Sequence, residues 1–115
     1  MKNSEKNSQL LYKSILSIIK ELNSYNPTNI IMRIKFLNKK GKIDTINFKT
    51  GIKEIDDNIV SLIKNYIDVE NEIDINCLFN LLNDDGFITR ISDYDEQITL
   101  DMLINPKLTN NIKKV

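Results

Sequence analysis

The sequence predicts an α+β domain in which a four-stranded antiparallel sheet carries two helices on one face. Three observations support this: helical spacing of apolar residues over residues 11–22, strict alternation over residues 30–37, and a second helical segment followed by another alternating one. The resulting order of elements is α-β-β-α-β-β. Elements in this order can bury their apolar faces by packing the helices as one layer on a sheet that forms the other. At 115 residues the chain has the length of one domain, residues 1–115, with residues 1–8 and 109–115 expected to fray.

The first helix is predicted by apolar residues that recur every three or four positions, at Leu11, Ile15, Ile18 and Leu22. Ser8 is a suitable N-cap, because its hydroxyl can accept a hydrogen bond from the first turn of a helix. Pro27 disfavours helical geometry in the residue before it, so the helix is expected to end near residues 23–26.

A hairpin follows the first helix. Residues 30–37 alternate so that one face of the predicted strand is wholly apolar, and residues 38–41 contain turn-forming Asn and Gly. Ile46 and Phe48 continue the apolar face on a second strand. Helical spacing then returns from Ile55 and predicts a helix that runs to about Asp68.

The segment from Ile73 to Leu82 fits two periodicities. Apolar residues at every second position favour a strand, whereas Leu78, Leu81 and Leu82 also fit one face of a helix. Asn and Ile are weak helix formers, so we interpret Asn76–Leu82 as a strand, joined by a tight turn at Gly86 to a return strand over Phe87–Ile91. Ile98–Ile104 is expected to dock on the core.

The composition excludes several kinds of chemistry. The chain has no His, so Ser–His and Cys–His nucleophile pairs and Cys/His zinc sites cannot be built within it. Its three glycines lie far apart, so no Gly-rich phosphate loop is present. We therefore expect no enzyme activity, no cofactor and no metal. The single cysteine, Cys77, and the absence of a long apolar run indicate a cytoplasmic protein without a membrane span.

Charge is segregated along the chain although the total is zero. Residues 1–53 hold eleven Lys or Arg and three Asp or Glu, residues 54–101 hold two and thirteen, and residues 102–115 hold three Lys. Charged runs often serve only to solvate a surface. The acidic half nevertheless predicts an acidic face, which disfavours a nucleic-acid partner, because binding nucleic acid requires Lys and Arg to neutralise phosphates.

The densest acidic stretch, residues 83–96, allows two metal-site interpretations. A calcium loop centred on Gly86 would lack carboxylates at its first and last ligand positions, which are Leu81 and Ser92. A Mg²⁺ site built from Asp84, Asp85, Asp93 and Asp95 would need the turn and the end of the strand to converge. We prefer a tight turn with Gly86 in the left-handed conformation.

A winged-helix module is the alternative if Asn76–Leu82 is helical. Residues 86–90 and 97–100 would then flank a wing with its tip at residues 92–96. The negative charge of this half makes such a module more suitable for a protein partner than for DNA.

The string from Leu78 to Asp95 resembles the late hairpin of YezG-type immunity proteins of bacterial polymorphic toxins. Shared features are a polar Asp-Gly turn, a strand beginning with an aromatic residue, and an Asp-Tyr-Asp stretch; the preceding helix, hairpin and helix are also similar, so the resemblance covers Leu10–Glu96. Trp residues, often seen in that family, are absent here. The resemblance implies an antitoxin that binds and blocks a toxin, often a nuclease.

Physical chemistry is compatible with that expectation. The active site of a nuclease must be basic, and an acidic surface can occupy it and speed association by electrostatic steering. Tyr94 lies among acids, so it is either an aromatic anchor of an interface or a half-buried tyrosine at the end of a strand. The residues expected to bind a basic protein partner are Asp84, Asp85, Asp93, Tyr94, Asp95 and Glu96. A phage-type inhibitor of a host defence nuclease would also present an acidic surface to a basic active site. The sequence leaves the oligomeric state open.

Overall fold

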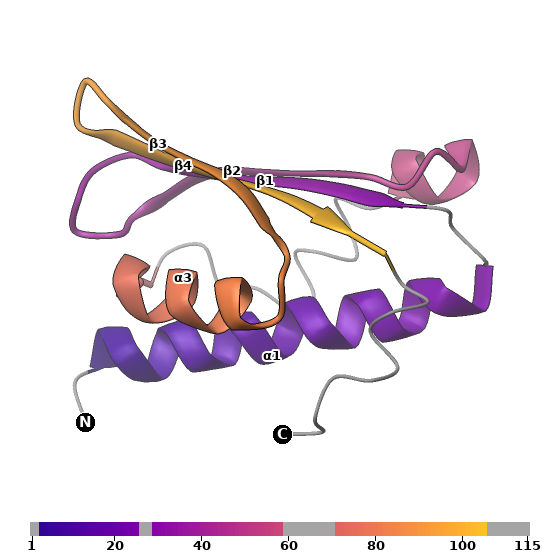
Figure 1. Ribbon diagram of the computed structural model, residues 1–115, viewed down its shortest axis with the longest axis horizontal. Coiled ribbons are helices and arrows are strands. Elements are labelled where there is room, and N and C mark those ends of the chain that lie inside the picture. The colour runs from indigo at the N-terminus through magenta and orange to yellow at the C-terminus, as the bar shows by residue number, and fades with distance from the viewer. Residues whose placement is uncertain (1–2, 26–28, 59–70, 106–115) are drawn as a thin grey trace.

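The computed structural model describes residues 3–25, 29–58 and 71–105, in which α1 and α3 pack on one face of a four-stranded antiparallel sheet (Figure 1). The helices are α1 (Asn3–Leu22) and α3 (Ile75–Asp84), and a short 3-10 turn, η1 (Asn23–Tyr25), follows α1. The strands are β1 (Ile30–Phe36), β2 (Ile43–Lys49), β3 (Ile88–Tyr94) and β4 (Gln97–Ile104). This arrangement confirms the predicted α+β class.

The predicted second helix is described only in part. Residues 53–58 are helical, and the rest of the predicted helix, to Asp68, lies outside the described residues. The expected fraying of residues 109–115 also concerns a segment outside them.

The core lies between the helices and the sheet. On β1, Ile30, Met32, Ile34 and Phe36 are fully buried while Ile31 and Arg33 are exposed, as the alternation predicts. α1 buries the stripe of apolar residues that its spacing predicts: Leu11, Tyr12, Ile15, Ile18, Ile19 and Leu22.

α1 begins at Asn3, earlier than expected, so the prediction of Ser8 as its N-cap is wrong. Ser8 is buried inside the helix, and its hydroxyl is 2.8 Å from the carbonyl oxygens of both Ser4 and Asp74. The physical reason is that a small hydroxyl can satisfy a neighbouring backbone carbonyl as well as a free N–H group. Ser8 therefore ties α1 to the start of α3.

The strand order is β2-β1-β4-β3, with every neighbouring pair antiparallel. Residues 98–104, expected only to dock on the core, belong to the central strand β4, where Leu100, Met102 and Ile104 are buried. Phe36 lies opposite Ile98, so the β1–β2 turn and the β3–β4 turn emerge at the same end of the sheet. β3 forms one edge of this sheet.

The interpretation of Asn76–Leu82 as a strand is wrong, because these residues lie inside α3. Asp74 caps this helix, since its carboxylate accepts a hydrogen bond from the backbone N–H of Cys77 at 3.1 Å. Ile75, Leu78 and Leu82 are the buried residues, at spacings of three and four. The alternation of apolar residues predicted a strand incorrectly, because so many residues of this segment are apolar that the strand and helix periodicities both fit it.

The predicted hairpin between residues 76–82 and 87–91 is therefore absent, and Gly86 ends the helix instead. The Phe87 N–H bonds to the Leu82 carbonyl at 3.1 Å and the Gly86 N–H bonds to the Asn83 carbonyl at 2.9 Å. This pair of bonds, with Gly86 at φ 77°, is the Schellman arrangement that terminates helices. The predicted left-handed conformation of Gly86 is confirmed, but the residue ends a helix and does not form a hairpin turn.

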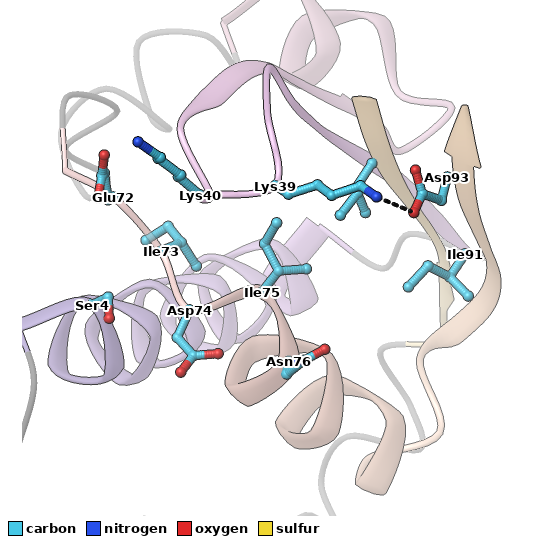
Figure 2. Close-up of a pocket in the computed structure, with 11 residues that line it drawn as sticks. Ser4, Lys39, Lys40, Glu72, Ile73, Asp74, Ile75, Asn76, Ile91 and Asp93 are labelled. Atoms are coloured by element: carbon cyan, nitrogen blue, oxygen red, sulfur yellow. Dashed lines mark ion pairs between the residues drawn. The ribbon is translucent and has the colours of Figure 1, made fainter. Parts of the chain in front are cut away.

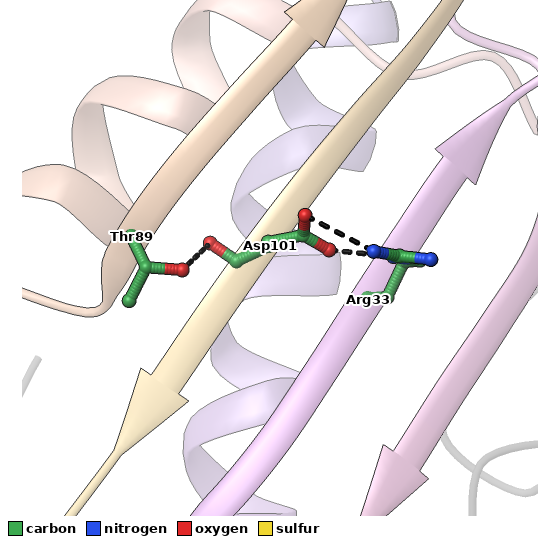
Figure 3. A network of polar contacts seen from close by, with 3 residues as sticks. All are labelled: Arg33, Thr89 and Asp101. Carbon is green, nitrogen blue, oxygen red and sulfur yellow. Dashed lines mark hydrogen bonds and ion pairs between the residues drawn. The ribbon is translucent and has the colours of Figure 1, made fainter.

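The seam between β1 and β4 joins the basic and acidic parts of the chain (Figure 3). The guanidinium of Arg33 donates to both carboxylate oxygens of Asp101, from Nε at 2.6 Å and from Nη2 at 3.3 Å. The Thr89 hydroxyl donates to the carbonyl of the same aspartate at 3.1 Å, which adds β3 to the contact. Folding thus places charges that are segregated in sequence next to one another.

Gly41 fixes the position of the β1–β2 turn. A Cβ at this position would lie 1.7 Å from the carbonyl oxygen of Ile73, and the Ile73 N–H donates to the Gly41 carbonyl at 2.9 Å. Only a residue without a side chain allows this approach. The turn is therefore held against the segment that leads into α3, and residues of both line one groove on the surface.

Candidate binding site

The β3–β4 hairpin ends in a two-residue turn made of acids. Asp95 and Glu96 have φ angles of 54° and 65°, so both occupy the left-handed region that a type I′ turn requires. Asn-Gly is the usual choice for such a turn, and a residue with a Cβ costs about 1 kcal/mol or more there. The turn thus carries two exposed carboxylates at positions where glycine would be less strained.

Tyr94 and Asp93 precede this turn and point to opposite faces of the sheet. Tyr94 pairs with Gln97 and is 79% exposed, whereas Asp93 pairs with Ile98 on the face that the helices cover. We call Asp93, Tyr94, Asp95 and Glu96 the acidic tip. In Figure 1 the hairpin that carries the tip extends beyond the helices.

Asp93 also contacts the other turn at this end of the molecule. Its carboxylate lies 3.6 Å from the Lys39 ammonium, and both side chains are more than half exposed. An ion pair so open to solvent contributes little to stability. It does, however, place a cation beside the acidic tip, so the surface at this end carries both signs of charge.

An open groove of about 580 Å³ lies between the two turns, the start of α3 and the inner face of β3 (Figure 2). Isoleucines line its interior, and its rim mixes both signs of charge, with Lys39 and Lys40 from the β1–β2 turn and the carboxylates of Glu72, Asp74 and Asp93 (Figure 2). The lining residues are Ser4, Lys39, Lys40, Glu72, Ile73, Asp74, Ile75, Asn76, Ile91, Asp93 and Ile98. Asp93 belongs to both the groove and the acidic tip, so the two surfaces are continuous.

Asp85 lies at the other end of β3, where the Tyr12 hydroxyl donates a hydrogen bond to its carboxylate. Burial of Tyr12, then this hydrogen bond and the charges of Asp85 and Asp84, raise the pKa of the Tyr12 phenol. The tyrosine therefore remains a protonated donor over the physiological range. Asp85 is engaged in a contact within the fold, whereas Asp84 beside it is exposed.

The six residues expected to form one binding face fall into two groups. Asp84 and Asp85 lie at the C-terminal end of α3, and the acidic tip lies at the far end of β3, about 20 Å away at the usual rise per residue of a strand. No local signal in the sequence identifies the groove, because its residues come from four separate segments. Only Asp74, an acid just before an apolar helical pattern, could have been read as a helix start.

Within residues 3–25, 29–58 and 71–105, no three Cys, Asp or Glu side chains are grouped so that they could hold a metal ion. Burial, followed by the charges of Asp74 and Glu5, raises the pKa of the Cys77 thiol, so little nucleophilic thiolate forms near neutral pH. This end of the molecule carries exposed charges, the exposed ring of Tyr94 and a groove lined by isoleucines and charged side chains.

Comparisons of the chain with models of protein families, with curated proteins and with solved structures gave no match. In the part of the chain that the structure describes, no helix combines the length and the apolar character needed to cross a membrane.

Proposed function

We propose that this protein is a non-catalytic binding protein that blocks a basic protein partner of the nuclease type, as immunity and inhibitor proteins do. The observation that carries the proposal is the acidic tip, where Tyr94 is 79% exposed between carboxylates on a projecting hairpin. A large aromatic side chain exposed to this extent is costly in water and common at protein interfaces.

Electrostatics supports the same proposal. A protein that cleaves nucleic acid needs a basic surface to hold phosphates, and the carboxylates of the tip are complementary to such a surface. The strained turn at Asp95 and Glu96 supports a role for these side chains, since glycine would relieve the strain and remove the charge. A phage-type inhibitor of a defence nuclease would use the same tip.

The helix α3 followed by the β3–β4 hairpin favours a second candidate, a winged-helix-type module. However, α3 contains no Lys or Arg, and Asn76, Asn80 and Asp84 are exposed on its surface. A helix of this kind has nothing to neutralise phosphates. The hairpin is also part of the four-stranded sheet through β4 and β1. This candidate is accordingly a protein-binding module and not a DNA reader.

The test is binding to, and inhibition of, the purified product of the gene that adjoins this one. Replacing Tyr94 with Ala should speed dissociation by about 30-fold, the equivalent of about 2 kcal/mol for an interface anchor. Neutralising the turn with Asp95→Asn and Glu96→Gln should slow association and flatten its dependence on salt. The matched control is Glu54→Gln with Asp57→Asn, which removes the same charge from exposed residues outside the tip.

A different result would reject the acidic tip as the binding surface. If reversal of Lys39, Lys40 and Lys42 abolished binding while the tip variants bound normally, the β1–β2 turn would be the functional surface. The partner would then be acidic, and the inhibitor proposal would lose its physical support.

A further inference from the structure

β3 is an edge strand, and its free side faces away from β4. In an antiparallel ladder, alternate residues direct their N–H and C=O groups to the neighbouring strand, and the others direct them to the opposite side. Among the described residues no strand pairs with that opposite side. Five of the seven β3 residues are exposed. An open edge of this length is a template for another strand.

The inner face of this edge is apolar at its centre. Ile91 is 50% exposed and points into the groove, toward Ile75 at the start of α3 (Figure 2). Ile98 on β4 lines the same groove. A strand added beside β3 would place alternate side chains over this opening. Apolar side chains at those positions would cover Ile91.

Acidic residues flank the edge at both ends. Asp84 and Asp85 precede β3, and Asp93, Asp95 and Glu96 lie at its other end, so residues 84–96 hold five carboxylates and one cation, Arg90. This distribution is complementary to a segment with basic residues toward both ends and apolar residues at its centre.

The other edge of the sheet has the opposite character. β2 lies between Lys42 and Lys53 and ends in Lys49, and the only acid in this stretch is Asp44. A basic segment would be repelled from β2 and attracted to β3. A second copy of this chain is also disfavoured at β3, because antiparallel pairing of two such edges would bring the acidic tip of one copy to Asp84 and Asp85 of the other.

We propose that the β3 edge receives an extended segment of the basic protein partner as a fifth strand of the sheet. The segment alternates basic and apolar residues: its central apolar side chain covers Ile91, and its Lys or Arg residues lie beside the carboxylates at the two ends of β3. This inference rests on the proposed function and names the part of the partner that is recognised. Main-chain hydrogen bonds along β3 supply affinity, and the groove and the charges supply selectivity.

The probe is a seven-residue peptide of alternating Lys and Val, with Lys at both ends and Val at its centre, titrated into the full-length ¹⁵N-labelled protein. The largest amide shifts are expected over residues 88–94, with small shifts over residues 43–49 on β2. The same peptide with every backbone nitrogen methylated keeps its charge but cannot donate main-chain hydrogen bonds, and it should bind at least about tenfold more weakly. A Glu–Val peptide of the same length should not bind.

Two matched variants test the role of the groove. Ile91→Lys should weaken binding of the Lys–Val peptide by about tenfold or more, because it removes the apolar contact with the central Val and adds a cation beside a cationic peptide. Ile31→Lys makes the same change at a similarly exposed isoleucine on the outer face of β1, and it should leave binding within about twofold.

Four outcomes would overturn the inference: equal binding of the methylated peptide, shifts confined to the acidic tip, shifts on β2, or no binding. A stable dimer whose interface protects the β3 amides would overturn it as well. The proposed function is tested separately by the tip variants. If Tyr94→Ala weakens binding of the partner protein while Ile91→Lys leaves that binding unchanged, the acidic tip is the binding surface and the β3 edge is not.

Discussion

Tyr12 and Asp85 form a contact between α1 and the end of α3. Two aspartates follow one another at this helix end, where the helix dipole is unfavourable for negative charge. The Tyr12 hydroxyl offsets that repulsion by donating a hydrogen bond to one of them. Asp85 therefore stabilises the fold, and among the predicted site residues it is the one with the clearest structural role.

Replacing Tyr12 with Phe should lower the free energy of unfolding by about 1 kcal/mol at pH 7, because a hydrogen bond to a charged acceptor is lost. The folded-state pKa of Tyr12 is raised, so its contribution is fully present below about pH 10 and is lost as the pH rises through the folded value. The stability difference between wild type and variant should therefore shrink in strongly alkaline solution. Urea unfolding at several pH values measures it.

Tyr25→Phe is the control, since Tyr25 is exposed and its hydroxyl should not affect stability. Equal stability of the Tyr12→Phe protein and the wild type at pH 7 would show that the Tyr12–Asp85 bond contributes nothing net.

At the scale of elements, α3 depends on its two ends more than on its intrinsic propensity. Ten residues are too few for a stable isolated helix, and three of them are Asn. Asp74 closes the N-terminal turn and Gly86 closes the C-terminal one, while Leu78 and Leu82 are buried in the core. The stabilisation from the two caps and from burial together outweighs the low helix propensity of these residues.

Asp74→Ala should destabilise the protein by about 1 kcal/mol, because the Cys77 N–H then loses its acceptor. Asp74→Ser keeps an N-cap oxygen and should cost only a few tenths of a kcal/mol. Neither change touches the backbone carbonyl of Asp74, to which Ser8 donates. Thermal or urea unfolding of the two variants is the measurement, and an equal loss in both would show that the cap is not the cause.

For the whole molecule, the strand order predicts a gradient of stability across the sheet. β1 and β4 are central and bury Met32, Ile34, Leu100 and Met102, whereas β3 is a largely exposed edge. Backbone amides of β1 and β4 should exchange with deuterium on the order of a hundredfold more slowly than the outward-facing amides of β3. Hydrogen-exchange NMR on the protein alone tests this, and uniformly slow exchange along β3 would mean that its edge is covered.

Local sequence patterns are enough to predict most of α1, the β1 strand with its apolar face, and the segregation of charge, because each is a regular feature of neighbouring residues. The sequence also places Asp93, Tyr94, Asp95 and Glu96 together, since they are consecutive. Local patterns do not distinguish strand from helix where most residues are apolar. Over residues 73–82 two periodicities fit equally well, and the weak helix formers in this segment led to the incorrect prediction of a strand.

Which apolar segment completes the sheet depends on long-range packing, which local patterns do not contain. Once residues 97–104 pair with β1, the segment 75–84 is left to cover the inner face as a helix with caps at both ends. The same choice puts Asp85 and the acidic tip at opposite ends of β3, and brings Lys39 to Asp93. Contacts of this kind join residues more than fifty positions apart, and they follow from burying one shared core, which no local window of sequence contains.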